Sequence, residues 1–183
     1  MSVTQNAPST AFHWTNPAGG SYGLGSNWNP AGVPVHNGAR SDAAIFDLHT
    51  GSPIGISATN VTAGRWEILN SEIAFSGDAT LSATSALPPS LAVGFGGRLD
   101  YQSGFLTTQN SVIGSGPPLS QLSLGTGTTW FNLGTLRVGT NGGAGGIDLG
   151  EMAFLSVNGN TEIGGGSDAE LTVHDGAVAQ FQS

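Results

Sequence analysis

The chain has 183 residues, of which 30 are Gly and 9% are charged, and its formal net charge at pH 7 is -8. This length suffices for one core, and the low charged fraction disfavours helices stabilised by salt bridges. Because twelve carboxylates face four Arg and no Lys, a phosphate backbone would be repelled, which excludes nucleic-acid binding as the main function. The absence of Cys excludes disulfides and thiolate metal sites.

Residues 1–55 contain five of the nine prolines and no repeat, which predicts an N-terminal cap or docking segment. The start, MSVTQNAPSTAFHW, has neither the basic segment nor the apolar run of a secretory signal, so we expect the chain to remain in the cell that makes it. No window approaches the 18 apolar residues of a membrane span. Trp14, Tyr22 and Trp28 stand among Gly, Asn and Pro, where they would either stack on sugars or plug an open first coil, and we favour the plug.

Residues 56–86 alternate apolar and polar side chains without a regular period, which predicts one or two irregular coils. A regular repeat then follows. A four-residue signature that ends in Val or Ile followed by Gly occurs at LAVG (91–94), SVIG (111–114), LRVG (136–139) and TEIG (161–164), and these glycines are 20, 25 and 25 residues apart.

Each signature is followed by a loop rich in Gly, Pro or Ser and then by a strict alternation. The inward residues of these alternating segments are expected to be Leu99/Tyr101, Leu122/Leu124, Ile147/Leu149 and Leu171/Val173. Five residues later, a third short apolar burst begins near Leu106, Thr129, Phe154 or Val178.

A period of 20 to 25 residues built only of short strands predicts a parallel β-solenoid of about four to six coils over residues 56–183. The alternative is an antiparallel β-sandwich. We favour the solenoid because the two-residue Asn-Gly and Asp-Gly turns typical of hairpins are scarce, whereas long loops such as GTNGGAGG suit coil corners.

The segment HWTNPAGGSYGLGSNWNPAGVPVHNGARSDAAIF, followed by VxxG and LTVxxGA repeats, resembles the N-terminal part of bacterial β-helix proteins related to autotransporter passengers and surface-repeat proteins. The resemblance implies a right-handed parallel β-helix that works in adhesion or display, with no shared catalytic residues. Here the signal peptide and the C-terminal anchor are missing, so we expect a β-helix module assembled in the cytoplasm.

Chemistry-bearing residues are sparse. Asp100 and Asp148 would share one surface ladder with Ser123 and Thr172, at a backbone separation of roughly 10 Å, and we interpret them as a solvated polar ladder. His13, His36, His49 and His174 are scattered without metal-ligand spacing. The glycine-rich loops resemble calcium-binding nonapeptides, but their Asp residues are out of place, so no metal or other cofactor is expected.

The end of the chain raises a different question, because Val178 and Phe181 still look like core residues and no cap follows them. We therefore expect either a partner subunit or a continuing solenoid at this tip. The candidate interface residues are Trp14, Tyr22, Trp28, Val178 and Phe181.

Together these features favour a non-enzymatic structural protein of a virion surface: a phage capsid decoration (cement) protein, or part of a tail fibre or spike. It would dock on another virion protein, such as a capsid protein, through residues 1–55 and self-associate, with a trimer favoured by analogy. The first alternative is a secreted adhesin or surface-display module, located outside the cell and able to bind surface glycans. The second is a polysaccharide-degrading β-helix enzyme.

Overall fold

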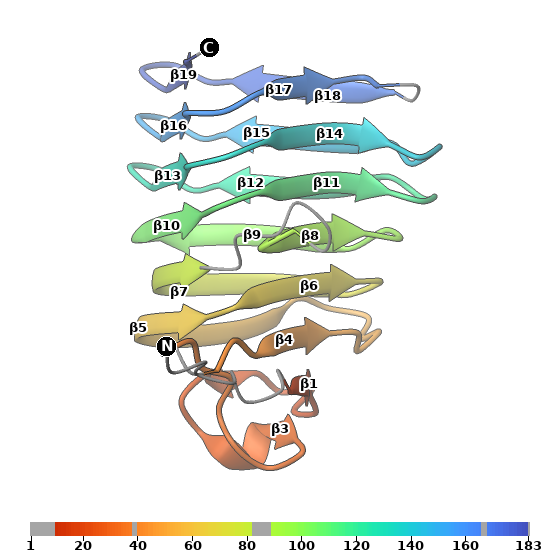
Figure 1. Ribbon diagram of the computed structural model, residues 1–183, viewed down its shortest axis with the longest axis vertical. Coiled ribbons are helices and arrows are strands. Elements are labelled where there is room, and N and C mark those ends of the chain that lie inside the picture. Colours follow the sequence, from red (N-terminus) through yellow and green to blue (C-terminus); the bar gives the residue numbers. More distant parts are fainter. Residues whose placement is uncertain (1–9, 38–39, 82–88, 166–167, 183) are drawn as a thin grey trace, which may run out of the picture.

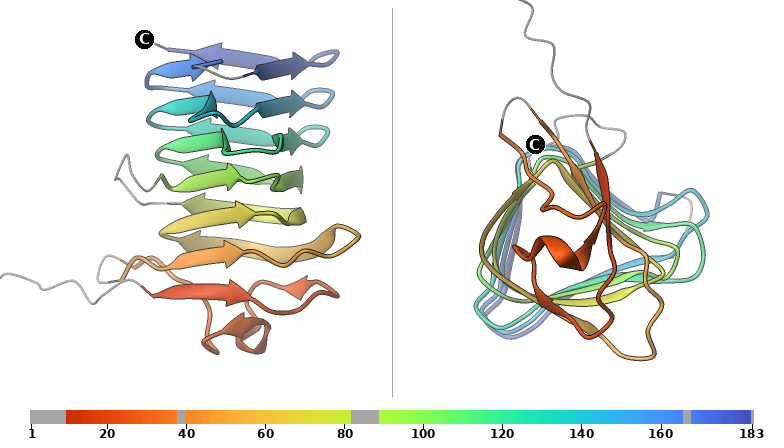
Figure 2. Two further views of the ribbon diagram at one scale, coloured as in Figure 1. Left: turned by 90° about the vertical axis from the view of Figure 1, so that its right-hand side faces the viewer. Right: turned by 90° about the horizontal axis from the view of Figure 1, so that it is seen from below.

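The computed structural model describes residues 10–37, 40–81, 89–165 and 168–182 and shows a right-handed parallel β-helix (Figure 1). Strands stack in successive levels along one axis, and along this axis the chain outlines a triangle with three faces (Figure 2). The predicted fold class is confirmed. Among the described strands, only β1 (Ala11–Trp14) and β3 (Trp28–Asn29) pair antiparallel, so the sandwich alternative is wrong.

The first face is one continuous sheet. From bottom to top in Figure 1 it contains β3, β1, β4 (Ala43–Phe46), β6 (Arg65–Leu69), β8 (Leu91–Gly94), β11 (Ser111–Ser115), β14 (Leu136–Thr140) and β17 (Thr161–Ile163). Because β4 and β1 already belong to this stack, the regular ladder begins before the predicted boundary at residue 55.

The second face contains β2 (Gly20–Ser21), β5 (Ile54–Ala63), β7 (Glu72–Leu81), β9 (Arg98–Ser103), β12 (Ser120–Leu124), β15 (Gly145–Leu149) and β18 (Ala169–Val173). The third face begins with the C-terminal halves of β5 and β7, which bend continuously around the corner. It continues with β10 (Phe105–Thr108), β13 (Thr129–Asn132), β16 (Phe154–Val157) and β19 (Val178–Phe181).

Equivalent residues of successive levels stack in columns inside the triangle, since side chains alternate between the two sides of a strand. On the second face the two inward columns are Ile54, Ile73, Leu99, Leu122, Ile147 and Leu171, and Ile56, Phe75, Tyr101, Leu124, Leu149 and Val173. The inward residues expected from the alternation in this segment are therefore confirmed. Below the last level these columns are fully buried and form one core.

The third face differs from the sequence expectation by one residue. Leu106 pairs with Trp130, which pairs with Leu155, and these three residues point inward. Thr129 and Phe154, which had been aligned with Leu106, instead share an outward row with Phe105. The physical reason is the length of the corner between the second and third faces, which is one residue shorter after Tyr101 than in the later levels. The residue five positions after the last inward residue of the second face therefore points inward at Leu106 but outward at Thr129 and Phe154.

Buried polar groups on the third face pair with one another inside the core. Thr108 Oγ1 donates to Asn132 Oδ1 over 2.8 Å, and Ser111 Oγ lies 2.8 Å from the same oxygen. The Trp130 indole N–H donates to Thr108 Oγ1 over 2.9 Å, and the Asn132 amide donates to the Gly134 carbonyl over 2.6 Å. This network allows polar residues to occupy core columns without unpaired groups.

Candidate interaction surfaces

The three aromatic residues proposed for the N-terminal interface lie inside the protein. Trp14, Tyr22 and Trp28 are 1%, 2% and 3% exposed, and the Trp28 ring centroid is 4.9 Å from each of the other two. The indole N–H of Trp14 donates to the Asn16 carbonyl, and that of Trp28 to the Tyr22 carbonyl. These rings close the lower end of the core, in agreement with their interpretation as a plug. Their assignment as contact residues for a partner is therefore corrected, because their side chains are buried.

Asp42 holds the N-terminal segment against the first regular level. Its side chain is fully buried, and its Oδ1 accepts hydrogen bonds from the Thr10 backbone N–H at 3.0 Å and from Arg40 Nε at 2.9 Å. Its Oδ2 accepts from the Val35 backbone N–H at 3.1 Å. Three donors from three positions compensate the buried charge, which gives this carboxylate a structural role.

The predicted acidic ladder exists, because Asp100, Ser123 and Asp148 pair in successive levels of the second face. The two carboxylates have different neighbours. Asp100 accepts a hydrogen bond from the Gln102 amide at 3.1 Å, whereas Asp148 Oδ1 lies 2.9 Å from Nε2 of His174, a pairing that the sequence reasoning missed. The two acids are thus two levels apart, with Ser123 between them, and each has a local partner.

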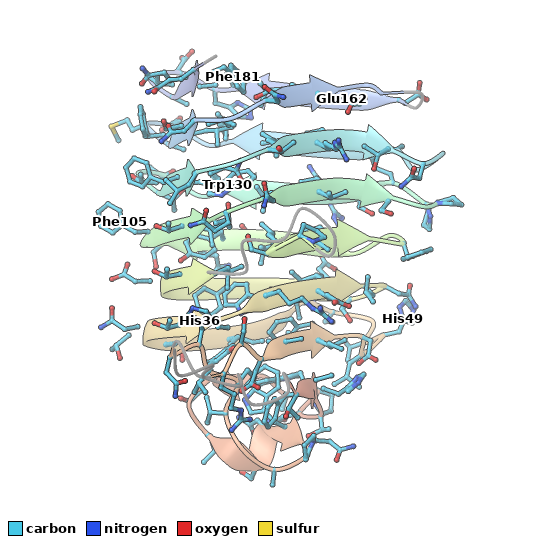
Figure 3. The ribbon with its side chains drawn as sticks, viewed as in Figure 1. His36, His49, Phe105, Trp130, Glu162 and Phe181 are labelled. Atoms are coloured by element: carbon cyan, nitrogen blue, oxygen red, sulfur yellow. The ribbon has the colours of Figure 1, made fainter. Side chains whose placement is uncertain are left out.

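The histidines do not converge. In Figure 3, His36 and His49 lie on different sides of the stack. His13 pairs with Asp47 at 2.9 Å, and His174 pairs with Asp148 several levels above. Within the described ranges, no three His, Asp or Glu side chains are grouped closely enough to hold a metal ion.

A cleft of about 420 Å³ opens beside the cap, between residues 33–37 and the segment 58–62 of β5. Tyr22 and His36 contribute to its lining, and the Tyr22 hydroxyl is buried. Burial raises the pKa of Tyr22 well above its usual range, so this hydroxyl stays neutral.

The uppermost level, β17 to β19, exposes apolar side chains that are buried in the levels below. Ile163, Val173 and Phe181 continue inward columns, yet each is more than two-fifths exposed. Figure 3 shows Phe181 at this end of the stack. Val178, the other candidate residue from this region, points outward on the third face and is 50% exposed.

The third face carries a further exposed apolar surface that the sequence reasoning missed. We define the third-face patch as Phe105, Phe131, Met152, Phe154 and Val178. Phe105 is 58% exposed, Met152 65% and Phe131 38%, and Phe105 projects from the side of the stack in Figure 3. The rings of Phe131 and Phe154 pack edge to face with centroids 6.0 Å apart. The sequence does contain one indication of this surface, since residues 101–136 include no Asp, Glu, Lys, Arg or His.

Comparisons of the chain with protein-family models, with curated proteins and with solved structures found no match. The resemblance to autotransporter-related β-helix proteins therefore stays a prediction. In the part of the chain that the structure describes, no helix has the length and apolar character needed to cross a membrane.

Proposed function

We propose that this protein is a non-enzymatic structural component of a virion surface, either a capsid decoration protein or a part of a tail fibre or spike. The observation that carries the proposal is the arrangement of the exposed apolar side chains on the surface. Most of the large apolar side chains that are exposed in the described residues lie in the third-face patch or on the uppermost level, on a backbone held by parallel ladders from β1 to β17; the others are Leu24, Phe95, Leu119 and Leu133. Apolar residues grouped in this way, in contrast to single scattered ones, are typical of surfaces that bind other proteins.

The architecture supports a role in assembly. Each inner level pairs with the levels above and below, so the molecule is a rod in which nearest-neighbour contacts propagate along one axis. The N-terminal segment closes the lower end of this rod through its buried aromatic cluster, while Leu24, beside the short helix Gly25–Asn27, is 53% exposed at its surface. Docking on a capsid protein would use this outer surface of the cap.

Immunogold electron microscopy with an antibody against the chain tests the location. We expect label on the capsid or tail of phage particles purified from the source, and none on particles from a strain that lacks the gene. Label on the envelope of intact cells would contradict the virion proposal. It would favour the surface-display alternative, which the resemblance to β-helix surface proteins also suggests.

The enzymatic alternative needs its own test. The chain and an Asp100→Asn/Asp148→Asn variant would be incubated with a panel of acidic and neutral polysaccharides, and the release of reducing ends would be measured. A structural protein releases none with either form. Turnover by the wild type that disappears in the variant would overturn the non-enzymatic role, because the substitutions replace both carboxylates with uncharged amides of nearly the same shape.

A further inference from the structure

The third-face patch is built from equivalent positions of successive levels. Phe105, Thr129, Phe154 and Val178 form one outward row, in which each residue pairs with the next level. Phe131 lies in the adjacent outward row and contacts Phe154, and Met152 lies at the corner that leads into β16. Because the parallel ladder fixes these positions, the patch has a defined shape before any partner binds, which lowers the entropic cost of association.

Charge distinguishes this face from the other two. The described strands β10, β13, β16 and β19 contain no charged residue. The second face carries Arg98, Asp100, Asp148 and Glu170, and the first face carries the pair Arg137–Glu162 at 3.4 Å. Asp78 lies at the lower edge of this face, where it accepts a hydrogen bond from the Phe105 N–H, and Glu151 and Asp175 lie at the corner beside Met152. Two copies of a chain with a net charge of -8 would therefore meet with the fewest like-charge contacts along β10, β13, β16 and β19.

We propose that the third-face patch binds a second copy of this chain, so that the rods associate side by side. The proposal rests on the structural role proposed above and names the partner and the surface. A charged partner would find no counter-charge on β10, β13, β16 and β19, whereas an uncharged apolar face is complementary to another of the same kind. An identical copy supplies that face, and the contact is then isologous, with the same patch on both subunits.

The size of the patch sets the strength of the association. Four strands at the usual spacing of about 4.8 Å span about 14 Å, so the face covers of the order of a few hundred Å². Stable interfaces bury about 800 Å² on each partner. The association is therefore reversible and depends on concentration, and the exposed aromatic rings contribute most of its free energy.

Sedimentation velocity over a dilution series tests the proposal on the full chain. We expect the wild type to shift from a dimer to a monomer on dilution, and the Phe105→Asp/Phe131→Asp variant to be monomeric at concentrations at least tenfold higher. Circular dichroism and cooperative unfolding report whether this variant still folds; if it does not, Phe105→Ser/Phe131→Ser, which adds no charge, replaces it with the same expected direction.

The matched control is Val112→Asp/Gln121→Asp, which adds the same two charges on the other two faces, at the level of Phe131. These positions pair across strands with Arg137 and Arg98, so the new carboxylates gain cationic neighbours. The control must associate like the wild type.

Three results would overturn the proposal: a monomeric wild type at all concentrations, an equal loss of association in the control, or a third-face variant that associates normally. Association lost only with Phe181→Asp would place the contact on the uppermost level, and a monomeric chain that binds glycans through Phe105 would assign the patch to another ligand. Each of these outcomes leaves the immunogold test of the virion role independent.

Discussion

Two neighbouring residues of β13 show how strongly the burial of a side chain depends on the side of the strand from which it projects. Trp130 is fully buried and its indole N–H is hydrogen bonded, whereas Phe131 lies on the outer side of the same strand and is 38% exposed. Their side chains are similar in size and adjacent in sequence. Their contributions to stability should nevertheless differ by several kcal/mol, because only one of them fills the core.

We predict that Trp130→Ala lowers the free energy of unfolding by about 3–5 kcal/mol. It removes a large core side chain and leaves Thr108 without its indole donor. Phe131→Ala, measured at a concentration at which the chain is monomeric, should change the free energy by less than about 1 kcal/mol. Urea unfolding followed by fluorescence or circular dichroism would measure both, and equal losses would contradict the assigned orientations.

The two tyrosines predict an alkaline limit to stability. Burial raises the pKa of Tyr22 and Tyr101 well above the usual value of about 10, and nearby Asp42 and Asp78 add to the effect. In the unfolded chain both phenols ionise near pH 10, so above this pH the folded state holds more protons than the unfolded state. Stability is therefore fully present below about pH 10 and falls as the pH rises, by about 1.4 kcal/mol per pH unit for each tyrosine.

The composition makes this prediction specific, because the chain contains neither Lys nor Cys to titrate in the same range. Urea midpoints between pH 8 and 11.5 would measure the slope. A Tyr22→Phe/Tyr101→Phe variant should show almost no slope above pH 10, although it starts from a lower stability because the Tyr101 hydroxyl no longer donates to the carbonyls of Gly77 and Phe105. A slope unchanged in the variant would show that other groups cause the alkaline loss.

Among the elements, the corner between the second and third faces restricts the residue type most strictly, because it requires glycine. Gly77 has φ +126°, and a Cβ there would overlap the carbonyl oxygen of Ala58 in the level below. Gly104, in the next level, has φ +101° and would collide in the same way with the Gly77 carbonyl. Here β7 bends without interruption from one face to the next, and only glycine allows the levels to approach so closely.

We predict that Gly77→Ala lowers the free energy of unfolding by at least about 2 kcal/mol, from the strained conformation together with the steric overlap. Gly55→Ala is the matched control in β5, since no atom lies within 4 Å of a Cβ built there, and we expect a change of less than about 1 kcal/mol. Thermal unfolding of both variants would measure the difference. A tolerated Gly77→Ala would show that the corner can relax.

The order of apolar and polar residues within each element was predictable from the sequence. Leu99, Leu122 and Ile147 point inward as expected, because alternation along a strand is a local property of the pleat. The outward position of Phe154 was not predicted, since it depends on the length of the preceding corner and on pairing with the level below. A shift of one residue moves a side chain from core to surface.

At the scale of the whole molecule, the stack has unequal ends. The lower end is closed by the buried aromatic cluster, whereas the uppermost level exposes core positions. In a solenoid the stability of each level depends on its neighbours, so a level paired on one side opens more readily than one paired on both sides.

We therefore predict a gradient of amide hydrogen exchange along the rod. Peptides from β17, β18 and β19 should exchange fastest, and those from β9, β12 and β15 slowest, because the central strands are paired on both edges. Exchange measured by mass spectrometry on a dilute sample would give the gradient. Equal protection of β18 and β12 would show that the uppermost level is covered in solution.

The amino-acid sequence by itself determined the class of the fold, the repeat of stacked levels, the inward columns of the second face and the acidic, Lys-free surface. These are local or additive properties, carried by alternation, by glycine spacing and by composition. Only the tertiary structure decided that Trp14, Tyr22 and Trp28 are buried together and that Phe105, Phe131 and Phe154 gather on strands without charged residues. These juxtapositions join residues from different levels, and the register between levels is set by corner lengths and by pairing across the stack, which no short segment specifies.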